Sequence, residues 1–565
     1  MELKQNSHFK NIFLLIILSY FFFFLGNSIF SLTNPDEVFY VQTAREMIDH
    51  NSWATPYLFD QPQFEKPVFL YWLLRIVFMF FGRTSFVARF IPALFATIGI
   101  LAVYALVVLG LRNRKKAFIS SLILMSSGIY IGLARTVFTD MVFSVFIVLS
   151  LLSFYWGYLR REYKALSMIL FSISAGAAVL TKGPLGVVIP GLVVILFLVL
   201  RKDLKYLFSK YLVWAIAVFL LVSLPWYILM VKKYGQSFTQ EFFYNDHLRR
   251  FLEAEHYNND TWYFYPLSMV LGMFPWVLYV IAGLFYLVKK FADNEDSVYD
   301  LLLLWIGVVF LVFQPAHSKL VSYVFPCFPA LAIIAGNFIY DADIYRGRLK
   351  KGALFAAMAT SAAFIIMTAA LIVFLFIPPK VIIEYIPTKQ PLYVVSFLLL
   401  VITVVFFILN KRSKIIKSSY ALMLVIPVMF TGVPFVQKNI EPYLSSKEIC
   451  RYLSDNHLVN NKILCSKPFA RGIRYYTDKQ VAVMNTFGKQ FFSAHPVPFL
   501  DDDHKVLEFF RGQKITYCVL KKSDISDIER IPGCVPAFGK EFNYKVLKKV
   551  GNEYVLKITP KKRLD

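Results

Sequence analysis

Long apolar segments dominate this chain and limit what it can fold into. The hydrocarbon core of a bilayer is about 30 Å thick, so a helix that rises about 1.5 Å per residue needs roughly 20 apolar residues to cross it. Such segments recur as far as Gln437. They predict an α-helical polytopic membrane protein with about thirteen transmembrane helices, near residues 11–30, 87–111, 117–134, 140–159, 165–181, 184–200, 211–230, 263–288, 299–316, 320–340, 352–377, 391–410 and 419–437.

The composition agrees with this interpretation. Hydrophobic residues make up 58% of the chain and charged residues 17%, whereas about a quarter of a soluble domain is charged. The formal net charge of +24 would also fit a nucleic-acid-binding protein. A polytopic protein gathers the same excess in its cytoplasmic loops, so the charge requires no nucleic acid as a partner.

The basic residues lie in alternate loops, which predicts the orientation. If the amino terminus is cytoplasmic, the inside loops hold Arg112 to Lys116, Arg160 to Lys164, Arg201 to Lys210, Lys289 and Lys290, Arg346 to Lys351, and Lys411 to Lys417. No small-residue cleavage pattern follows the first segment, so we expect an uncleaved anchor. With an odd number of spans the carboxyl terminus lies outside, in the periplasm if this is a bacterial inner membrane.

Residues 440–565 differ from the membrane domain, 1–439. Short apolar runs alternate there with helix-like stretches and predict a small α/β domain that closes with a hairpin turned at Gly551 and Asn552. Four cysteines fall in this tail: Cys450, Cys465, Cys518 and Cys534. An exported domain can pair them in disulfides, and four buried free thiols are the equal alternative.

Ionisable residues collect in the outside loops, chiefly in the long loops 31–86 and 231–262. Such groups are costly near a membrane and tend to mark substrate paths. The first loop contains Asn34-Pro-Asp-Glu-Val-Phe-Tyr40 and Phe64-Glu-Lys-Pro67. The apolar stretch Val68 to Phe81 is short for a span, so we expect an interfacial helix with Tyr71, Trp72 and Arg75 at headgroup depth.

Two kinds of site are open to these residues. The carboxylates Asp36, Glu65 and Asp140, together with His247, suit acid/base chemistry or a divalent metal such as zinc, manganese or magnesium; surface carboxylates that pair with nearby cations are the alternative. Lys66, Lys182 and Lys319 suit a lipid phosphate, and snorkelling lysines are the alternative. No P-loop pattern is present in the sequence, which argues against ATP-driven transport.

The outside motifs together resemble a known family. Asp36-Glu37, Phe64-Glu-Lys-Pro67, Ala88 to Pro92, Thr181-Lys-Gly-Pro184, the His-x-x-Arg-Phe from His247 and Ser318-Lys-Leu320 occur in the order seen in the bacterial lipid A aminoarabinose transferases. These belong to the protein O-mannosyltransferase-like branch of the GT-C glycosyltransferases. The resemblance covers about residues 30 to 330.

The resemblance implies an inverting transfer of a sugar from a polyprenyl-phosphate-linked donor to lipid A or another periplasmic envelope acceptor. It implies that Asp36 is catalytic or positions the acceptor, that Lys66 contacts the donor phosphate with help from Lys182, and that Glu65, Asp140 and His247 hold a metal. Lys319 faces the same side, so we expect it to bind the donor phosphate as well. We also expect substrate contacts from Glu37, Tyr40 and Arg250. Membrane lipids are further expected partners.

One position departs from the family pattern. The family often reads Asp-Glu-x-Arg-Tyr, whereas Phe39 stands here in place of that arginine. A phosphate or acceptor contact expected from the arginine is missing, which leaves the acceptor open. A flippase or transporter of lipid-linked sugars, a protein O-glycosyltransferase of the same family, and a tail that recruits an assembly partner are the alternative functions.

Overall fold

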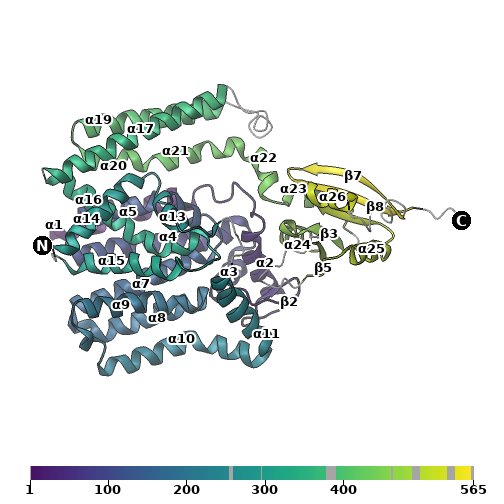
Figure 1. Cartoon of the computed structure of the whole chain (residues 1–565), viewed down its shortest axis with the longest axis horizontal. Coiled ribbons are helices and arrows are strands. Elements are labelled where there is room, and N and C mark those ends of the chain that lie inside the picture. Colours follow the sequence, from purple (N-terminus) through teal and green to yellow (C-terminus); the bar gives the residue numbers. More distant parts are fainter. Residues whose placement is uncertain are drawn as a thin grey trace. The chain divides into compact units, whose positions relative to one another are not determined.

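A computed structural model describes residues 2–253, 259–293, 296–345, 347–376, 390–459, 462–485, 497–530 and 541–561. The chain divides into two compact units, which are drawn in Figure 1. The membrane unit comprises residues 1–27, 66–70 and 89–435. The mixed unit comprises residues 28–65, 71–88 and 436–565, so most of the first predicted outside loop groups with the tail.

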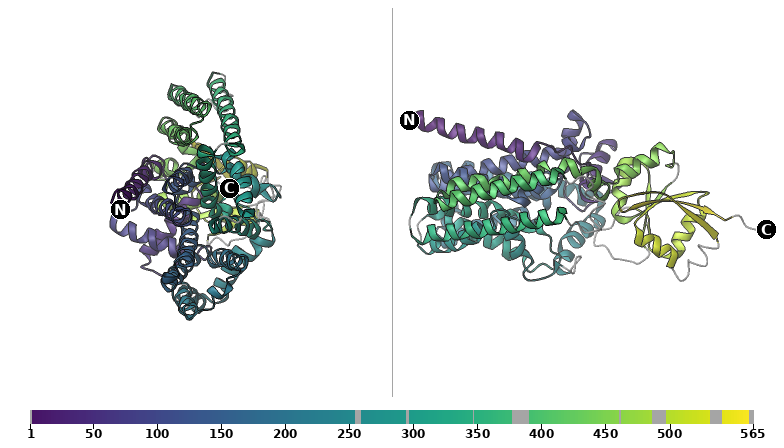
Figure 2. Two further views of the ribbon diagram at one scale, coloured as in Figure 1. Left: turned by 90° about the vertical axis from the view of Figure 1, so that its left-hand side faces the viewer. Right: turned by 90° about the horizontal axis from the view of Figure 1, so that it is seen from above.

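Seven helices of the described chain are long and apolar enough to cross a membrane. Their axes run side by side in the membrane unit, and one view of Figure 2 looks along them. They are α4 (Ser85–Leu111), α7 (Thr139–Leu159), Arg161–Lys182 with α8 (Lys164–Lys182), α10 (Lys210–Tyr234), Val321–Ile344 with α16 (Phe328–Ile344), α17 (Arg348–Phe376) and α19 (Gln390–Lys411).

Two bent helix pairs raise this number to nine. One is α5 (Arg114–Met125) with α6 (Gly128–Ala134), and the other joins α20 (Ile415–Met423) and α21 (Val425–Thr431) to α22 (Val433–Leu444). Apolar helices also lie at the other predicted spans, but they are shorter or broken: α1 (Glu2–Ser19), α9 (Leu185–Leu200), α13 (Phe264–Leu271), α14 (Val277–Ala292) and α15 (Ser297–Phe313). The polytopic fold is confirmed, and the number thirteen stays a prediction.

Helices α7, α8, α9 and α10 pack side by side (Figure 1). A small residue permits the close approach of α8 to α10, because a Cβ atom on Gly176 would lie 2.9 Å from Cγ1 of Val222. Membrane helices commonly pack through small residues, since lipid tails give no hydrophobic drive to association.

A helix is present at the predicted place, α3 (Phe69–Phe81), and its interfacial position stays a prediction. Met79, Phe80 and Phe81 at its carboxyl end are exposed. Tyr71 and Arg75 are buried in the protein, and their depth in the membrane stays a prediction. Arg75 donates to the Met47 carbonyl at 2.6 Å.

The tail forms a six-stranded sheet of order β5-β4-β3-β6-β8-β7. Four strands are parallel: β5 (Phe499–Leu500), β4 (Val481–Met484), β3 (Ile463–Ser466) and β6 (Thr516–Leu520). The last two form the predicted hairpin, β7 (Phe542–Val550) and β8 (Glu553–Pro560), with β8 antiparallel to β6. The α/β fold of the tail is confirmed.

Helices cover both faces of this sheet. Alternate strand residues pack with α25 (Asp503–Arg511) and α26 (Lys522–Arg530) on one face, and with α23 (Lys447–Asp455) and α24 (Ala470–Thr477) on the other. This alternation follows from the period of two in a strand. Cys450, Cys465 and Cys518 are buried free thiols in these cores, and Cys534 lies outside the described residues.

Candidate functional site

The predicted site residues other than Lys319 form one cluster in each unit. The cation cluster of the membrane unit consists of Lys66, Asp140, Lys182, Asp246, His247 and Arg250. The acidic cluster of the mixed unit consists of Asp36, Glu37, Phe39, Tyr40, Glu65 and Arg471.

Asp246 joins two cations of the cation cluster. It lies on a π-helical segment, Gln240–Arg249. The sequence of this segment does not predict a π-helix. Lys66 Nζ is 2.5 Å from one carboxylate oxygen, and Arg250 Nη1 is 3.2 Å from the other, one helical turn away. Burial by itself would raise the pKa of Asp246, but the charges of Lys66 and Arg250 outweigh it and leave that pKa below its ordinary value.

Lys182 and Asp140 form a second buried ion pair. Asp140 lies in the first turn of α7 and Lys182 in the last turn of α8, which are the helix ends that the backbone dipole favours for each charge. Their Nζ and Oδ1 atoms are 2.5 Å apart. The ammonium also lies 5.0 Å from the centroid of the Tyr323 ring.

His247 connects these two pairs. Its Nδ1 is 2.6 Å from the Phe242 carbonyl and its Nε2 is 3.4 Å from the Lys182 carbonyl. Gly183 permits this contact, because its φ is +107° and a Cβ atom there would lie 2.5 Å from Nε2. Burial lowers the pKa of His247, so the ring is neutral at pH 7.

Lys319 lies in a neighbouring ion pair. Its Nζ is 2.7 Å from Asp260, which also accepts from His317 at 2.7 Å. These two bonds lower the pKa of Asp260. The loop carrying Lys319 is tied to the cation cluster by its backbone, because Ser318 N donates to the Arg250 carbonyl at 3.1 Å.

In the acidic cluster, α2 (Asp36–Asp49) presents three predicted residues. Glu37 is fully buried and accepts hydrogen bonds from the backbone and the hydroxyl of Thr33, both at 3.0 Å. These two hydrogen bonds stabilise the turn before α2, so Glu37 has a structural role. Tyr40 is buried, with its ring centroid 6.2 Å from that of Tyr71.

Asp36 stands at the start of α2, next to the charges of three groups. Burial raises the pKa of Asp36, and the carboxylates of Glu65 and Glu37 raise it further, whereas Arg471 lowers it. The net pKa lies above the ordinary value. Asp36 is therefore a better proton acceptor than an exposed aspartate.

The three predicted metal ligands have other partners. Asp140 pairs with Lys182, His247 lies against two carbonyls, and Glu65 Oε1 is 3.4 Å from Arg471 Nη2. Within the described ranges, no group of three His, Cys, Asp or Glu side chains could hold a metal ion. The divalent metal stays a prediction.

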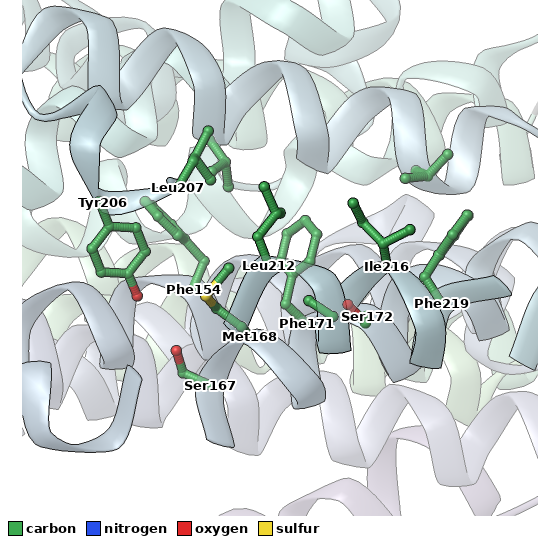
Figure 3. A pocket seen from close by; sticks show the side chains of 13 residues that line it. Phe154, Ser167, Met168, Phe171, Ser172, Tyr206, Leu207, Leu212, Ile216 and Phe219 are labelled. Carbon is green, nitrogen blue, oxygen red and sulfur yellow. The ribbon is translucent and has the colours of Figure 1, made fainter. Parts of the chain in front are cut away.

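An apolar cavity of ≈ 180 Å³ lies among α7, α8, α9 and α10 (Figure 3). Phe154, Met168, Phe171 and Phe219 are among its lining residues. None of its lining residues is charged or belongs to either cluster. The cavity therefore offers mainly apolar contacts and no catalytic group.

Sequence reasoning missed three polar residues of these sites. Asp246 carries a local signal, since an acid four residues before Arg250 on a helix predicts a pair. Asp260 and Arg471 carry none, because their partners are distant in sequence.

Comparison with known proteins agrees with this architecture. Residues 9–237 match the family model described as dolichyl-phosphate-mannose-protein mannosyltransferase. The chain is 30% identical over 317 residues to the undecaprenyl phosphate-alpha-4-amino-4-deoxy-L-arabinose arabinosyl transferase 2 of Proteus mirabilis, and 29% identical over 315 residues to the Yersinia pestis transferase. Each match covers 55% of this chain and 56% of the relative, so the chain spans little more than half the length of the relatives it matches.

Solved structures show the same fold. The structure of ArnT from Cupriavidus metallidurans bound to undecaprenyl phosphate has a TM-score of 0.75 at 19% identity and covers 97% of both chains. The oligosaccharyltransferase of Archaeoglobus fulgidus has a TM-score of 0.55 at 14% identity and covers 95% of this chain and 73% of that one. The fold of this chain is therefore the one that the ArnT structure has, a polytopic helical membrane part followed by a mixed α/β domain.

The chain is similar in sequence to the aminoarabinose transferases and in fold to ArnT, so the resemblance seen in the sequence motifs is confirmed.

Proposed function

We propose that this protein is a bacterial inner-membrane glycosyltransferase. It transfers a sugar, with inversion, from a polyprenyl-phosphate-linked donor to lipid A or another envelope acceptor on the periplasmic side. The cation cluster carries this proposal, because Lys66, Lys182 and Arg250 come from distant segments and are linked by buried carboxylates and His247. Such a group of cations suits a phosphate at the edge of the bilayer.

The transfer breaks the bond between the anomeric carbon and the phosphate oxygen, and the phosphate leaves with the electron pair. Fixed cations stabilise that developing charge without reorganising. Lys66 and Lys182 are each 2.5 Å from a carboxylate, so a donor phosphate competes with Asp246 and Asp140 for them. His247 lies against the turn that carries Lys182, close to Gly183 and to the Lys182 carbonyl.

Asp36 acts on the acceptor. A hydroxyl acceptor needs a general base, and the raised pKa of Asp36 suits that task. An acceptor phosphate is already anionic and needs only positioning. With either acceptor, we expect the loss of the Asp36 carboxylate to reduce transfer most.

The test is a transfer assay on the full chain in nanodiscs, with undecaprenyl phosphate-linked 4-amino-4-deoxy-L-arabinose as the first donor and lipid A as the first acceptor. The relatives' names motivate the choice of donor, and the resemblance seen in the sequence motifs motivates the choice of acceptor. We expect a mass increase of lipid A that Asp36→Asn abolishes and that Asp501→Asn, at an exposed aspartate of the tail, leaves intact. Transfer by the Asp36→Asn variant would overturn the catalytic assignment.

A protein acceptor is the second candidate, favoured by the description of the family model that matches residues 9–237. The same assay with exported proteins as acceptors distinguishes it. A transporter is less favoured, because the charged residues of the described candidate spans lie near the span ends and line no path through the bilayer.

A further inference from the structure

Arg471 is a cation of the α/β domain that lies in the acidic cluster. Its Nη2 is 3.4 Å from Glu65 Oε1, and its Cζ is 4.4 Å from the centroid of the Phe39 ring. Both side chains of the ion pair are largely buried, with exposed fractions of 13% and 12%. No role predicted from the sequence includes this arginine.

The helix that carries Arg471 is held tightly against the first loop. A Cβ atom on Gly472 would lie 2.2 Å from Oδ1 of Asn34, so a larger residue there cannot keep this approach. On the same helix, the Tyr475 carbonyl accepts from Arg45 Nη1 at 3.1 Å. These contacts place Arg471 relative to α2 and to Asp36 at its start.

The Arg471 guanidinium lies against an aromatic ring as well as beside a carboxylate. A buried ion pair by itself is weak support for stability, because desolvation offsets its Coulomb energy. The face of Phe39 meanwhile orients the guanidinium, and an oriented planar cation is the arrangement that recognises phosphate.

The charges of the acidic cluster also favour an anion-binding role for Arg471. Among the groups whose charges shift the pKa of Asp36 in the described structure, Arg471 is the one cation, beside Glu65 and Glu37. An anionic substrate group near Asp36 would meet repulsion without it. The arginine that the family often has in the first loop is Phe39 here, and the Arg471 guanidinium lies against that ring.

We propose that Arg471 binds an anionic phosphate group of the acceptor, so that the α/β domain completes the acceptor site around Asp36. This inference rests on the proposed function and adds one residue of the α/β domain to its acceptor site, for an acceptor that carries a phosphate group on lipid A or on another envelope glycan. Donor phosphate binding by the cation cluster is a separate task.

The test measures transfer kinetics for the full chain in nanodiscs. We expect Arg471→Ala to raise the KM for a phosphorylated acceptor at least about tenfold, the loss of one charge-assisted contact, while the KM for the donor stays within about twofold. Arg471→Lys should be intermediate, because a point charge cannot bind two oxygens. Arg511→Ala, at an exposed ion pair of the same domain, should match the wild type.

The decisive variant moves the guanidinium from position 471 to position 39. Phe39→Arg combined with Arg471→Ala should regain acceptor affinity, which a folding defect of Arg471→Ala would not allow. An unchanged acceptor KM in Arg471→Ala, or an equal rise of donor and acceptor KM, would overturn the inference.

Direct binding separates this inference from the proposed function. Titration of phosphorylated and dephosphorylated lipid A, without donor, should show a preference for the phosphorylated form that Arg471→Ala removes. The same titration with a phosphorylated envelope glycan distinguishes the two acceptor sources. Binding that depends on Arg471, without any transfer, would refute the glycosyltransferase activity and support the phosphate site. Transfer without such binding would support the activity and refute the phosphate site.

Discussion

Arg474 Nε lies 3.3 Å from Glu46 Oε1, and Nη2 of the same guanidinium lies 2.7 Å from Asp60. Glu46 is almost completely buried and also accepts from the backbone N–H groups of Phe59 and Asp60 at 3.1 and 2.8 Å. A helix of the tail and the first loop therefore share one buried charge network, and they form one unit in spite of their separation in sequence.

Replacing Arg474 by Met should destabilise the mixed unit by about 3 kcal/mol, because a buried carboxylate loses its charged partner. Scanning fluorimetry and limited proteolysis of the full chain in detergent would measure this loss. Arg511→Met breaks an exposed pair and should cost less than about 1 kcal/mol. Equal effects of the two substitutions would contradict the buried network.

Lys182→Met should lower kcat/KM for transfer about a hundredfold or more, because a cation that faces the leaving phosphate is lost. It should also lower the unfolding temperature, since Asp140 keeps an unpaired buried charge. The double variant Asp140→Asn with Lys182→Met should regain stability and stay inactive. Recovery of activity in the double variant would show that Lys182 serves only to neutralise Asp140.

The acid limb of the pH profile should report Asp36. Its pKa is raised, so the carboxylate becomes available as a base only at a pH above the ordinary range of aspartate. With a hydroxyl acceptor, kcat/KM should rise with pH through this raised pKa and then level off. Glu65→Gln removes a charge that raises the pKa, so the limb should move to lower pH; a limb at the ordinary aspartate value in the wild type would contradict the assignment.

Glu553 should make the tail less stable as the pH rises. Burial raises its pKa from the ordinary 4.5 to about 8, although the hydrogen bond from Ser446 opposes this. The folded state holds the proton more tightly, so the contribution is fully present below pH 4.5 and is lost as the pH rises to about 8.

The unfolding temperature of the full chain, measured at pH 5 and pH 9, would test this. Glu553→Gln should remove most of the pH dependence because it mimics the protonated acid. A wild-type protein as stable at pH 9 as at pH 5 would contradict the raised pKa.

Chelation tests the divalent metal, which stays a prediction. We expect EDTA to leave transfer within about twofold, because Asp140 and Glu65 already pair with Lys182 and Arg471. Loss of activity that returns with added zinc, manganese or magnesium would reverse this expectation. It would mean that these ion pairs open when the metal binds.

Much of the fold follows from local pattern. The apolar segments predict the long helices, and the strand at Ile463–Ser466 and the hairpin turned at Gly551 are where the alternation of residues places them. Helix length is less certain, because an apolar composition continues through breaks such as the one between α13 and α14. The sequence did not show that Arg75 donates to the Met47 carbonyl and to the side chain of Asn51.

The candidate site divides in the same way. Lys66, Lys182 and His247 were found from motifs, since basic residues in outside loops are conspicuous in an apolar chain. Their partners were less accessible to sequence reasoning. A carboxylate that neutralises a lysine can come from any segment that the fold brings near, and composition does not indicate which.

The sequence by itself determined that this chain spans a membrane and that an α/β domain follows, and it predicts that the basic loops face one side. Each of these depends on the water or lipid around a short stretch of chain. Only the tertiary structure decided that Lys66 meets Asp246 across 180 residues and that Glu65 meets Arg471 across 406. Such pairs depend on packing between distant segments, because a charge loses its water on burial and accepts whichever opposite charge the packing brings within reach.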